Sequence, residues 1–235
     1  MCLAGVCLAG VLAATLAGCA VATGDPQGRE ASPPPVQTSD PAISPPVATG
    51  TAAGPPAVTP PAVTRPVLAP AAQAELDQQL VRAAKANDVP SVTRLIQAGG
   101  SVNAKDAIQD SAFLFAGAEG FNEILELTLA NGADVASTNR FGGTALIPAS
   151  EHGHVDTVRI LLAAGVPVNH VNNLGWTALQ EAILLNDGGP RQQEVVRQLL
   201  AAGADTGVRD PQGRTALENS ERLGFSAITE LIRGH

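Results

Sequence analysis

Apolar residues in the second half of the chain recur in short groups that predict pairs of helices. In the clearest copy, Leu146 and Ala149 fit a short first helix, which Thr144 would cap and Gly153 would end. A second helix is predicted from four residues at the spacing of one helix face: Val155, Val158, Leu161 and Leu162. Gly165 follows this helix, where a left-handed residue commonly ends one.

The same group of residues returns at a fixed period. Glycines in the position of Gly165 are separated by 33, 33 and 38 residues: Gly99, Gly132, Gly165 and Gly203. Ser111, Thr144, Thr177 and Thr215 show the same three separations. Such a period indicates a stack of small units, none of which can bury its apolar face alone. We predict five units, near residues 76–106, 107–139, 140–172, 173–210 and 211–235.

The two ends of the predicted stack depart from the pattern as caps would. In the first unit Gln78 occupies the threonine position, while Val92, Leu95 and Ile96 still provide an apolar helix face. In the last unit Arg233 replaces the second leucine. A stack needs polar outer faces at its ends. The fourth unit carries five extra residues around 186–191, which we interpret as a turn.

The recurring elements resemble the ankyrin repeat, with its G-x-T-P-L, G-H-x-x-x-V and L-L-x-x-G-A-x-x-N motifs. Here the motifs begin at Gly142, Gly153 and Leu161, and the resemblance covers roughly residues 76–235. The chain has Ala145, Ala178 and Ala216 where the family usually has proline, and Ile147, Gln180 and Glu218 where it usually has histidine. The resemblance implies an all-α solenoid of helix-turn-helix units joined by hairpin loops, with a concave binding surface.

The N-terminus predicts an export signal. Residues 3–18 are apolar and small, and too few to span a bilayer comfortably. Leu16-Ala17-Gly18-Cys19 resembles a bacterial lipobox, which implies a signal peptide over residues 1–18 and a lipid on Cys19. No Lys or Arg precedes the apolar run, which a misassigned start codon would explain. The alternative is that the cysteines are simply small apolar residues of a leader.

Residues 19–72 predict a disordered tether. Thirteen of the 18 prolines lie between Pro26 and Pro70, among Ala, Thr, Val and Ser, with no apolar periodicity. Such a segment favours extended conformations and acts as a semi-stiff spacer, although it could also be a Pro-rich ligand for a partner. The folded domain is therefore predicted over residues 73–235.

The charge of the chain excludes a nucleic-acid role. The formal net charge is −8, and no basic cluster could neutralise a phosphate backbone. Five Phe, one Trp and no Tyr leave few side chains to stack on bases.

No residue pattern predicts catalysis, a cofactor or a metal site. His152 and His154 are two residues apart, which would hold one zinc ion only in an extended segment, and His154 occupies the structural position of the G-H motif. Glu151 and His152 could form an acid–base pair, but no motif surrounds a Ser or Cys nucleophile.

A partner-binding surface is predicted at the hairpin tips. The third residue before each Ser/Thr position is bulky and apolar in the three central units, namely Ile108, Phe141 and Leu174, and Trp176 directly precedes Thr177. Exposed apolar and aromatic residues are typical interface anchors. We predict a binding stripe of these four residues, bordered by Arg140, Glu151, His152 and Arg214. The alternative is that they pack on neighbouring hairpins and seal the core.

Together these features predict an exported, lipid-anchored protein that binds a protein partner at a bacterial envelope. The chain would lie on the periplasmic or cell-surface side of a membrane, and in a Gram-negative cell Ala20 after the lipidated residue implies the outer membrane. The alternatives are a sensor or binder of a small ligand or cell-wall fragment, and an enzyme with a catalytic group in the concave face. The sequence predicts neither the partner nor the oligomeric state.

Overall fold

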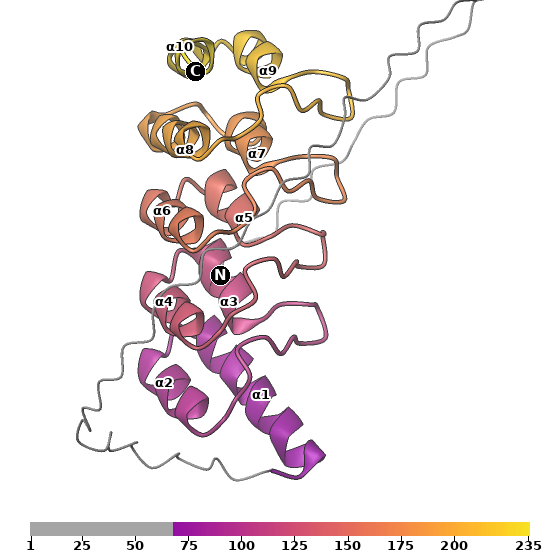
Figure 1. Ribbon diagram of the computed structural model, residues 1–235, viewed down its shortest axis with the longest axis vertical. Coiled ribbons are helices and arrows are strands. Elements are labelled where there is room, and N and C mark those ends of the chain that lie inside the picture. Colours follow the sequence, from indigo (N-terminus) through magenta and orange to yellow (C-terminus); the bar gives the residue numbers. More distant parts are fainter. Residues whose placement is uncertain (1–67) are drawn as a thin grey trace, which may run out of the picture. The chain divides into compact units, whose positions relative to one another are not determined.

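The computed structural model describes residues 68–235, which form ten helices and no strands (Figure 1). Residues 1–67 lie outside the described range, and with them the predicted signal peptide, Cys19 and nearly all of the predicted tether. No helix within 68–235 has the length and apolar character to cross a membrane. In chain order the helices are α1 Pro70–Lys85, α2 Val89–Gln97, α3 Ala112–Glu119, α4 Asn122–Ala130, α5 Leu146–Glu151, α6 Val155–Ala163, α7 Ala178–Leu184, α8 Pro190–Ala201, α9 Ala216–Leu223 and α10 Ser226–Arg233.

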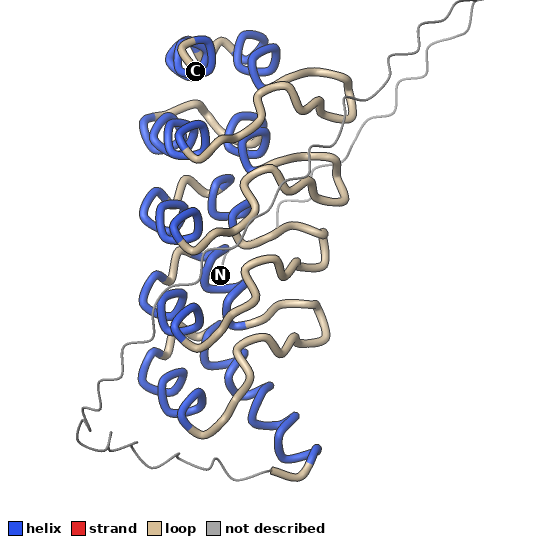
Figure 2. Tube along the Cα trace, viewed as in Figure 1, coloured by secondary structure: helices blue, strands red, loops and turns tan. Residues whose placement is uncertain are grey.

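The ten helices form two layers. The odd-numbered helices make an inner layer and the even-numbered helices an outer one, and the loops between pairs project to one side as hairpins (Figure 2). Each helix packs on its pair partner and on the equivalent helices of adjacent pairs. The all-α repeat fold predicted from the 33-residue period is therefore confirmed.

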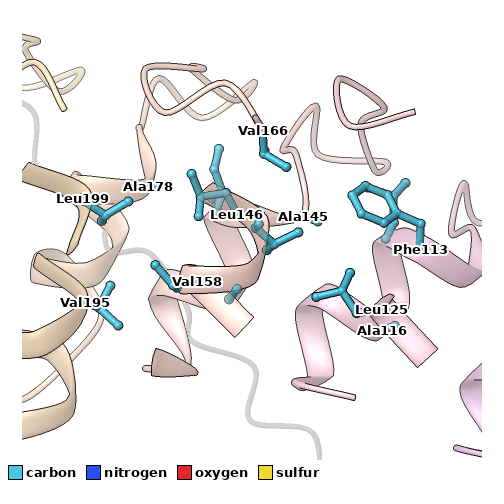
Figure 3. Packing of buried hydrophobic residues seen from close by; sticks show 14 of the residues in the cluster. Phe113, Ala116, Leu125, Ala145, Leu146, Val158, Val166, Ala178, Val195 and Leu199 are labelled. Atoms are coloured by element: carbon cyan, nitrogen blue, oxygen red, sulfur yellow. The ribbon is translucent and has the colours of Figure 1, made fainter. Parts of the chain in front are cut away.

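The core runs unbroken through all five pairs. Residues such as Phe113, Leu146, Leu179 and Ile228 are fully buried in a single cluster (Figure 3). The inner helices pack closely: a Cβ on Gly117 of α3 would lie only 2.8 Å from that of Ala145. Both ends of the stack agree with the prediction. Val92, Leu95 and Ile96 of the first unit are buried, and Arg233 of the last unit is exposed.

Three inner helices begin as predicted, on a hydroxyl cap. The side chains of Ser111, Thr177 and Thr215 each accept a hydrogen bond from the backbone N–H three residues on. Gln180 and Glu218 return the bond to the N–H of their cap residue, which completes a capping box. These two residues occupy the family's histidine position, so the departure from the motif strengthens the cap.

The predicted cap at Thr144 is wrong. Helix α5 begins at Leu146 after Ala145, and the Thr144 Oγ1 is buried without a hydrogen-bond partner among the described residues. Pro148 explains the difference, because it lacks the N–H that would bond the Thr144 carbonyl oxygen. The Ile147 N–H bonds that carbonyl instead, at 3.2 Å, and is no longer available to Oγ1.

Each of the four hairpins is organised by one carboxylate or amide. Asp106, Asn139, Asn172 and Asp210 lie five residues before the Ser/Thr position, and the Oδ1 of each accepts two backbone N–H bonds from the tip that follows. Side-chain bonds of this kind favour turns over regular structure. They hold the tip backbone in one conformation.

Asparagines also join one hairpin base to the next. Asn103 donates to the Gly132 carbonyl and accepts from the Asp134 N–H, and Asn169 does the same with Gly203 and Asp205. At the equivalent positions between the second and third units, Ala136 replaces the asparagine and Pro167, which has no N–H to donate, replaces the aspartate.

The first helix begins before the predicted domain boundary. It begins at Pro70, inside the segment assigned to the tether, three residues before the predicted boundary at 73. Gln78, in the threonine position, lies in the middle of this helix, and its Nε2 donates to the Lys105 carbonyl at 3.1 Å. The Gln78 side chain therefore hydrogen-bonds the backbone of the first hairpin and does not cap a helix.

Candidate binding groove

The hairpin tips and the inner helices enclose a groove of about 530 Å³ across the three central units. Its lining residues follow the repeat, because they fall mainly in four positions relative to Ser111, Thr144 and Thr177. Two of the positions lie three residues and one residue before the Ser or Thr, and the other two lie four and eight residues after it. Around Ser111 they are Ile108, Asp110, Phe115 and Glu119, and around Thr144 they are Phe141, Gly143, Pro148 and His152. Around Thr177 they are Leu174, Trp176, Glu181 and Leu185. We call these positions the groove columns.

The hairpin side of the groove is apolar. Ile108, Phe141 and Leu174 keep 50%, 50% and 52% of their surface exposed and do not belong to the buried core. Trp176 is half-buried beside them, and its Nε1 has no acceptor among the described residues. The alternative that these side chains seal the core is therefore not what the structure shows.

The two cations of the groove are already paired. Lys85 Nζ lies 2.8 Å from Asp110 and 2.6 Å from Asp106, and Arg140 lies 3.7 Å from Asp110. The Arg140 guanidinium also lies 4.5 Å from the centre of the Phe141 ring, at the distance of a cation–π contact. Both cations therefore pair with hairpin carboxylates and stabilise the tips, and Lys85 Nζ also lies 5.3 Å from the centre of the Phe115 ring on α3.

The inner-helix side of the groove carries three carboxyl groups, on Glu119, Glu151 and Glu181. None of them lies in a salt bridge within residues 68–235. Glu119 and Glu151 are the last residues of α3 and α5, where the helix dipole disfavours negative charge. This wall is thus a row of carboxyl groups without a Lys or Arg partner, and His152 lies among them.

Glu181 is the most perturbed group of the groove. Its side chain is 95% buried at the floor, and Oε1 accepts a hydrogen bond from Asn172 Nδ2 at 2.7 Å. Burial and the nearby Glu151 carboxylate raise the pKa of Glu181 to about 7, although the Asn172 bond and the His152 charge oppose them. Near neutral pH this carboxyl therefore exists in both protonation states.

Seven of the eight predicted binding residues line the groove: Ile108, Arg140, Phe141, Glu151, His152, Leu174 and Trp176. Arg214 does not. It belongs to the fifth unit, one step beyond the groove, and its Nε lies 3.3 Å from Asp210 at the base of its own hairpin. The fifth unit presents the polar Gln212 where the central units present an apolar tip.

The histidines have structural partners. His152 Nδ1 lies 2.8 Å from the Ala118 carbonyl oxygen, and its ring packs edge-on against His154 at 5.5 Å. Burial lowers the pKa of His154, whose ring covers Gly120. Within the part of the chain that the structure describes, no three His, Cys, Asp or Glu side chains gather in a metal-binding arrangement.

Of the residues in the inner-helix half of the groove, only Glu151 and His152 were predicted from the sequence. Phe115, Pro148 and Glu181 lie four residues after the Ser/Thr position, and Glu119 and Leu185 lie eight after. Counting forward from each Ser/Thr at helical spacing would have found them, because the fourth and eighth residues share one helix face.

Comparisons with known proteins agree with the repeat architecture. A family model described as ankyrin repeats (3 copies) matches residues 80–169 and 113–210. The chain is 40% identical to the ankyrin repeat protein YahD of Escherichia coli (strain K12) over 142 residues, which are 60% of this chain and 71% of YahD.

Two solved structures are also similar. One is an ankyrin repeat domain from Acinetobacter baumannii AYE, with a TM-score of 0.65 and 54% identity, covering 66% of this chain and 79% of that one. The other is the ankyrin repeat protein EF0377, with a TM-score of 0.64, 38% identity and the same coverages of 66% and 79%.

Proposed function

Because the chain belongs to the ankyrin-repeat family, we propose that it is a binding protein whose groove accepts a segment of a protein partner. The observation that carries this proposal is the row of half-exposed tips, Ile108, Phe141 and Leu174, above a groove of about 530 Å³. Large apolar side chains at hairpin tips contribute little to folding, and truncating an interface anchor of this kind typically costs about 2 kcal/mol or more of binding free energy.

A preformed groove supports the same conclusion. The Asn173 N–H donates to the Phe141 carbonyl at 2.9 Å, and Lys105 Nζ donates to the Thr138 carbonyl at 2.6 Å. Adjacent tips are thus joined before any partner arrives. Little ordering entropy then opposes association, which favours affinity without a large interface.

The leader and the tether complete the proposal. A signal peptide over residues 1–18, a lipid on Cys19 and a Pro-rich spacer over residues 19–72 would present the groove at a distance from a bacterial membrane. Cys19→Ala tests the anchor. Cells fed a fatty-acid probe should label the wild-type chain and not this variant, and equal labelling of both would refute lipidation at Cys19.

Crosslinking in intact cells, followed by mass spectrometry, tests partner binding. We expect Phe141→Ala and Leu174→Ala to lose the captured protein while their melting temperatures change little, since both side chains lie outside the core. Val171→Ala is the matched control, because Val171 is also exposed at 46% on the hairpin of Leu174 but does not line the groove. Equal capture by all three variants would show that the groove is not the binding surface.

One observation favours a second candidate, a small-ligand sensor. The groove volume of about 530 Å³ lies in the range of about 300–1,000 Å³ that is usual for small-molecule sites. A thermal shift with cell-wall fragments, together with no captured protein, would support this function instead.

A further inference from the structure

The two walls of the groove have different chemistry. The hairpin wall offers Phe141, Leu174 and Trp176, and the inner-helix wall offers Glu119, Glu151 and Glu181. Among the described residues, Lys85 and Arg140 line the groove and are bound to Asp110 of a hairpin, whereas His152 lies on the inner-helix wall beside the carboxyl groups. A bound segment therefore meets apolar surface on one side and carboxyl groups without a Lys or Arg partner on the other.

We propose that the groove selects a peptide segment in which a lysine or arginine lies close to a bulky apolar residue. The cation would lie against Glu151 and Glu181, and the apolar side chain would contact Phe141, Leu174 and Trp176. This proposal rests on the proposed function and specifies the partner by its chemistry.

Charge complementarity is the first argument. Glu119 and Glu151 lie at the C-terminal ends of their helices, and neither last turn contains Lys or Arg, although His152 follows Glu151 as the C-cap of α5. Lys, Arg or His normally provides favourable charge at that place. A cation supplied by the partner would act on both carboxylates and on the negative ends of the two helix dipoles.

Glu181 provides the second argument, because it is buried and yet faces the groove. Its Oε1 is bound by Asn172, while Oε2 has no hydrogen-bond partner within residues 68–235. The charged groups around it are Glu151 and His152 from α5, and its pKa is raised to about 7. A cation beside Glu181 favours the ionised form, so binding would release a proton near neutral pH.

A basic segment also suits the molecule as a whole. The chain carries a formal net charge of −8, which steers cationic segments toward it and away from acidic competitors. The apolar hairpin wall further requires a bulky apolar residue in the bound segment, because a segment without one would leave the hairpin tips exposed to water.

A randomised peptide library displayed on phage tests the proposal with the full chain as bait. We expect the enriched peptides to carry Lys or Arg within a few residues of Leu, Ile, Phe or Trp. Enrichment of acidic or uncharged apolar peptides would overturn this inference and leave the proposed function standing. No enrichment of any sequence would count against the proposed function itself.

Matched variants then test the site with one enriched peptide, labelled for fluorescence anisotropy. The double variant Glu151→Gln/Glu181→Gln should bind at least about tenfold more weakly, since it loses both charges opposite the cation. The control Glu123→Gln/Glu126→Gln makes the same charge change on exposed residues of the outer helix α4, away from the groove, and should bind as the wild type does. Equal weakening of both variants would attribute the attraction to net charge and overturn the site.

A charge reversal distinguishes direct pairing from a folding effect. Glu151→Lys should reject the basic peptide and bind a copy in which Glu replaces the Lys or Arg. Weak binding of both peptides by a variant with an unchanged melting temperature would contradict a direct contact with Glu151.

Discussion

The roles of individual side chains are clearest where a residue differs from its equivalents in the other repeat units. Thr144 and Thr177 occupy equivalent, buried positions, yet only Thr177 caps a helix, because Pro148 diverts the N–H that Thr144 would need. Glu181 is likewise unusual, as a carboxyl buried at the floor of the groove. Both differences can be measured as free energies of unfolding.

The two threonines should respond differently to the same change. We expect Thr177→Val to lower the free energy of unfolding by about 1 kcal/mol, because it removes a helix cap. We expect Thr144→Val to be neutral or stabilising, because it removes a buried hydroxyl that has no partner. Urea unfolding of both variants checks this, and an equal loss in both would show that Thr144 is bonded after all.

The pH dependence of stability should report Glu181. Its raised pKa means that the folded chain binds this proton more tightly than the unfolded chain, so stability falls as pH rises from about 4.5 to about 7 and levels off above. The penalty at pH 8 is at most about 3.5 kcal/mol, since the pKa is raised from 4.5 to about 7 and each pKa unit corresponds to about 1.4 kcal/mol.

Glu181→Gln should abolish that penalty. The variant should be more stable than the wild type at pH 8 and equally stable at pH 4, as measured by urea unfolding at both values. Together with weaker binding of a basic peptide, this gain would show that the carboxyl is retained for binding and not for folding. A gain of the same size at pH 4 would show that charge is not its cause.

At the scale of elements, side-chain hydrogen bonds fix the hairpins both at the tip and at the base. The Oδ1 atoms of residues such as Asn139 and Asn172 hold the tips, and Asn103 and Asn169 join the bases. The joint that is absent lies between the second and third units, at Ala136 and Pro167.

Restoring the absent joint should stabilise the stack. In Ala136→Asn/Pro167→Asp, the new amide could donate to the Gly165 carbonyl and accept from the new N–H, as Asn169 does with Gly203 and Asp205. We expect a favourable coupling of about 1 kcal/mol between the two changes in a double-mutant cycle, since a hydrogen bond contributes roughly that amount. Zero coupling would show that the hairpin bases do not approach at this place.

The existence and order of the helices were predictable because the same pattern of apolar residues, Ser or Thr and glycine recurs in successive units. The groove was only half predictable. A bulky apolar tip residue such as Phe141 can be recognised in the sequence, because a hairpin tip does not need such a side chain in order to fold. Glu181 cannot be recognised in this way, because in the sequence it resembles any other helical glutamate. Its burial depends on α5 and on the Asn172 hairpin, which the residue pattern does not place. The lost cap at Thr144 depends similarly on one proline four residues away.

At the scale of the whole described domain, every unit is supported only by its neighbours. Helices α5 and α7 pack between units on both sides, whereas α9 and α10 have a unit on one side only. Stability in such stacks is approximately a sum of unit and interface contributions.

Amide exchange should therefore vary along the stack. We expect slower exchange in α5 and α7 than in α10 when the full chain is followed by hydrogen–deuterium exchange and mass spectrometry, because end units open without disturbing two interfaces. Uniform exchange across all helices would indicate one cooperative unit.

The groove columns have a consequence for how such a protein changes over generations. Most of their side chains lie outside the buried core, so under the proposed function substitutions there would be limited more by the partner than by folding. A lineage could acquire a new specificity by drift in these positions alone, and a protein engineer could randomise them without redesigning the scaffold. Glu181 sets the limit of that freedom, since its replacement would alter stability and recognition together.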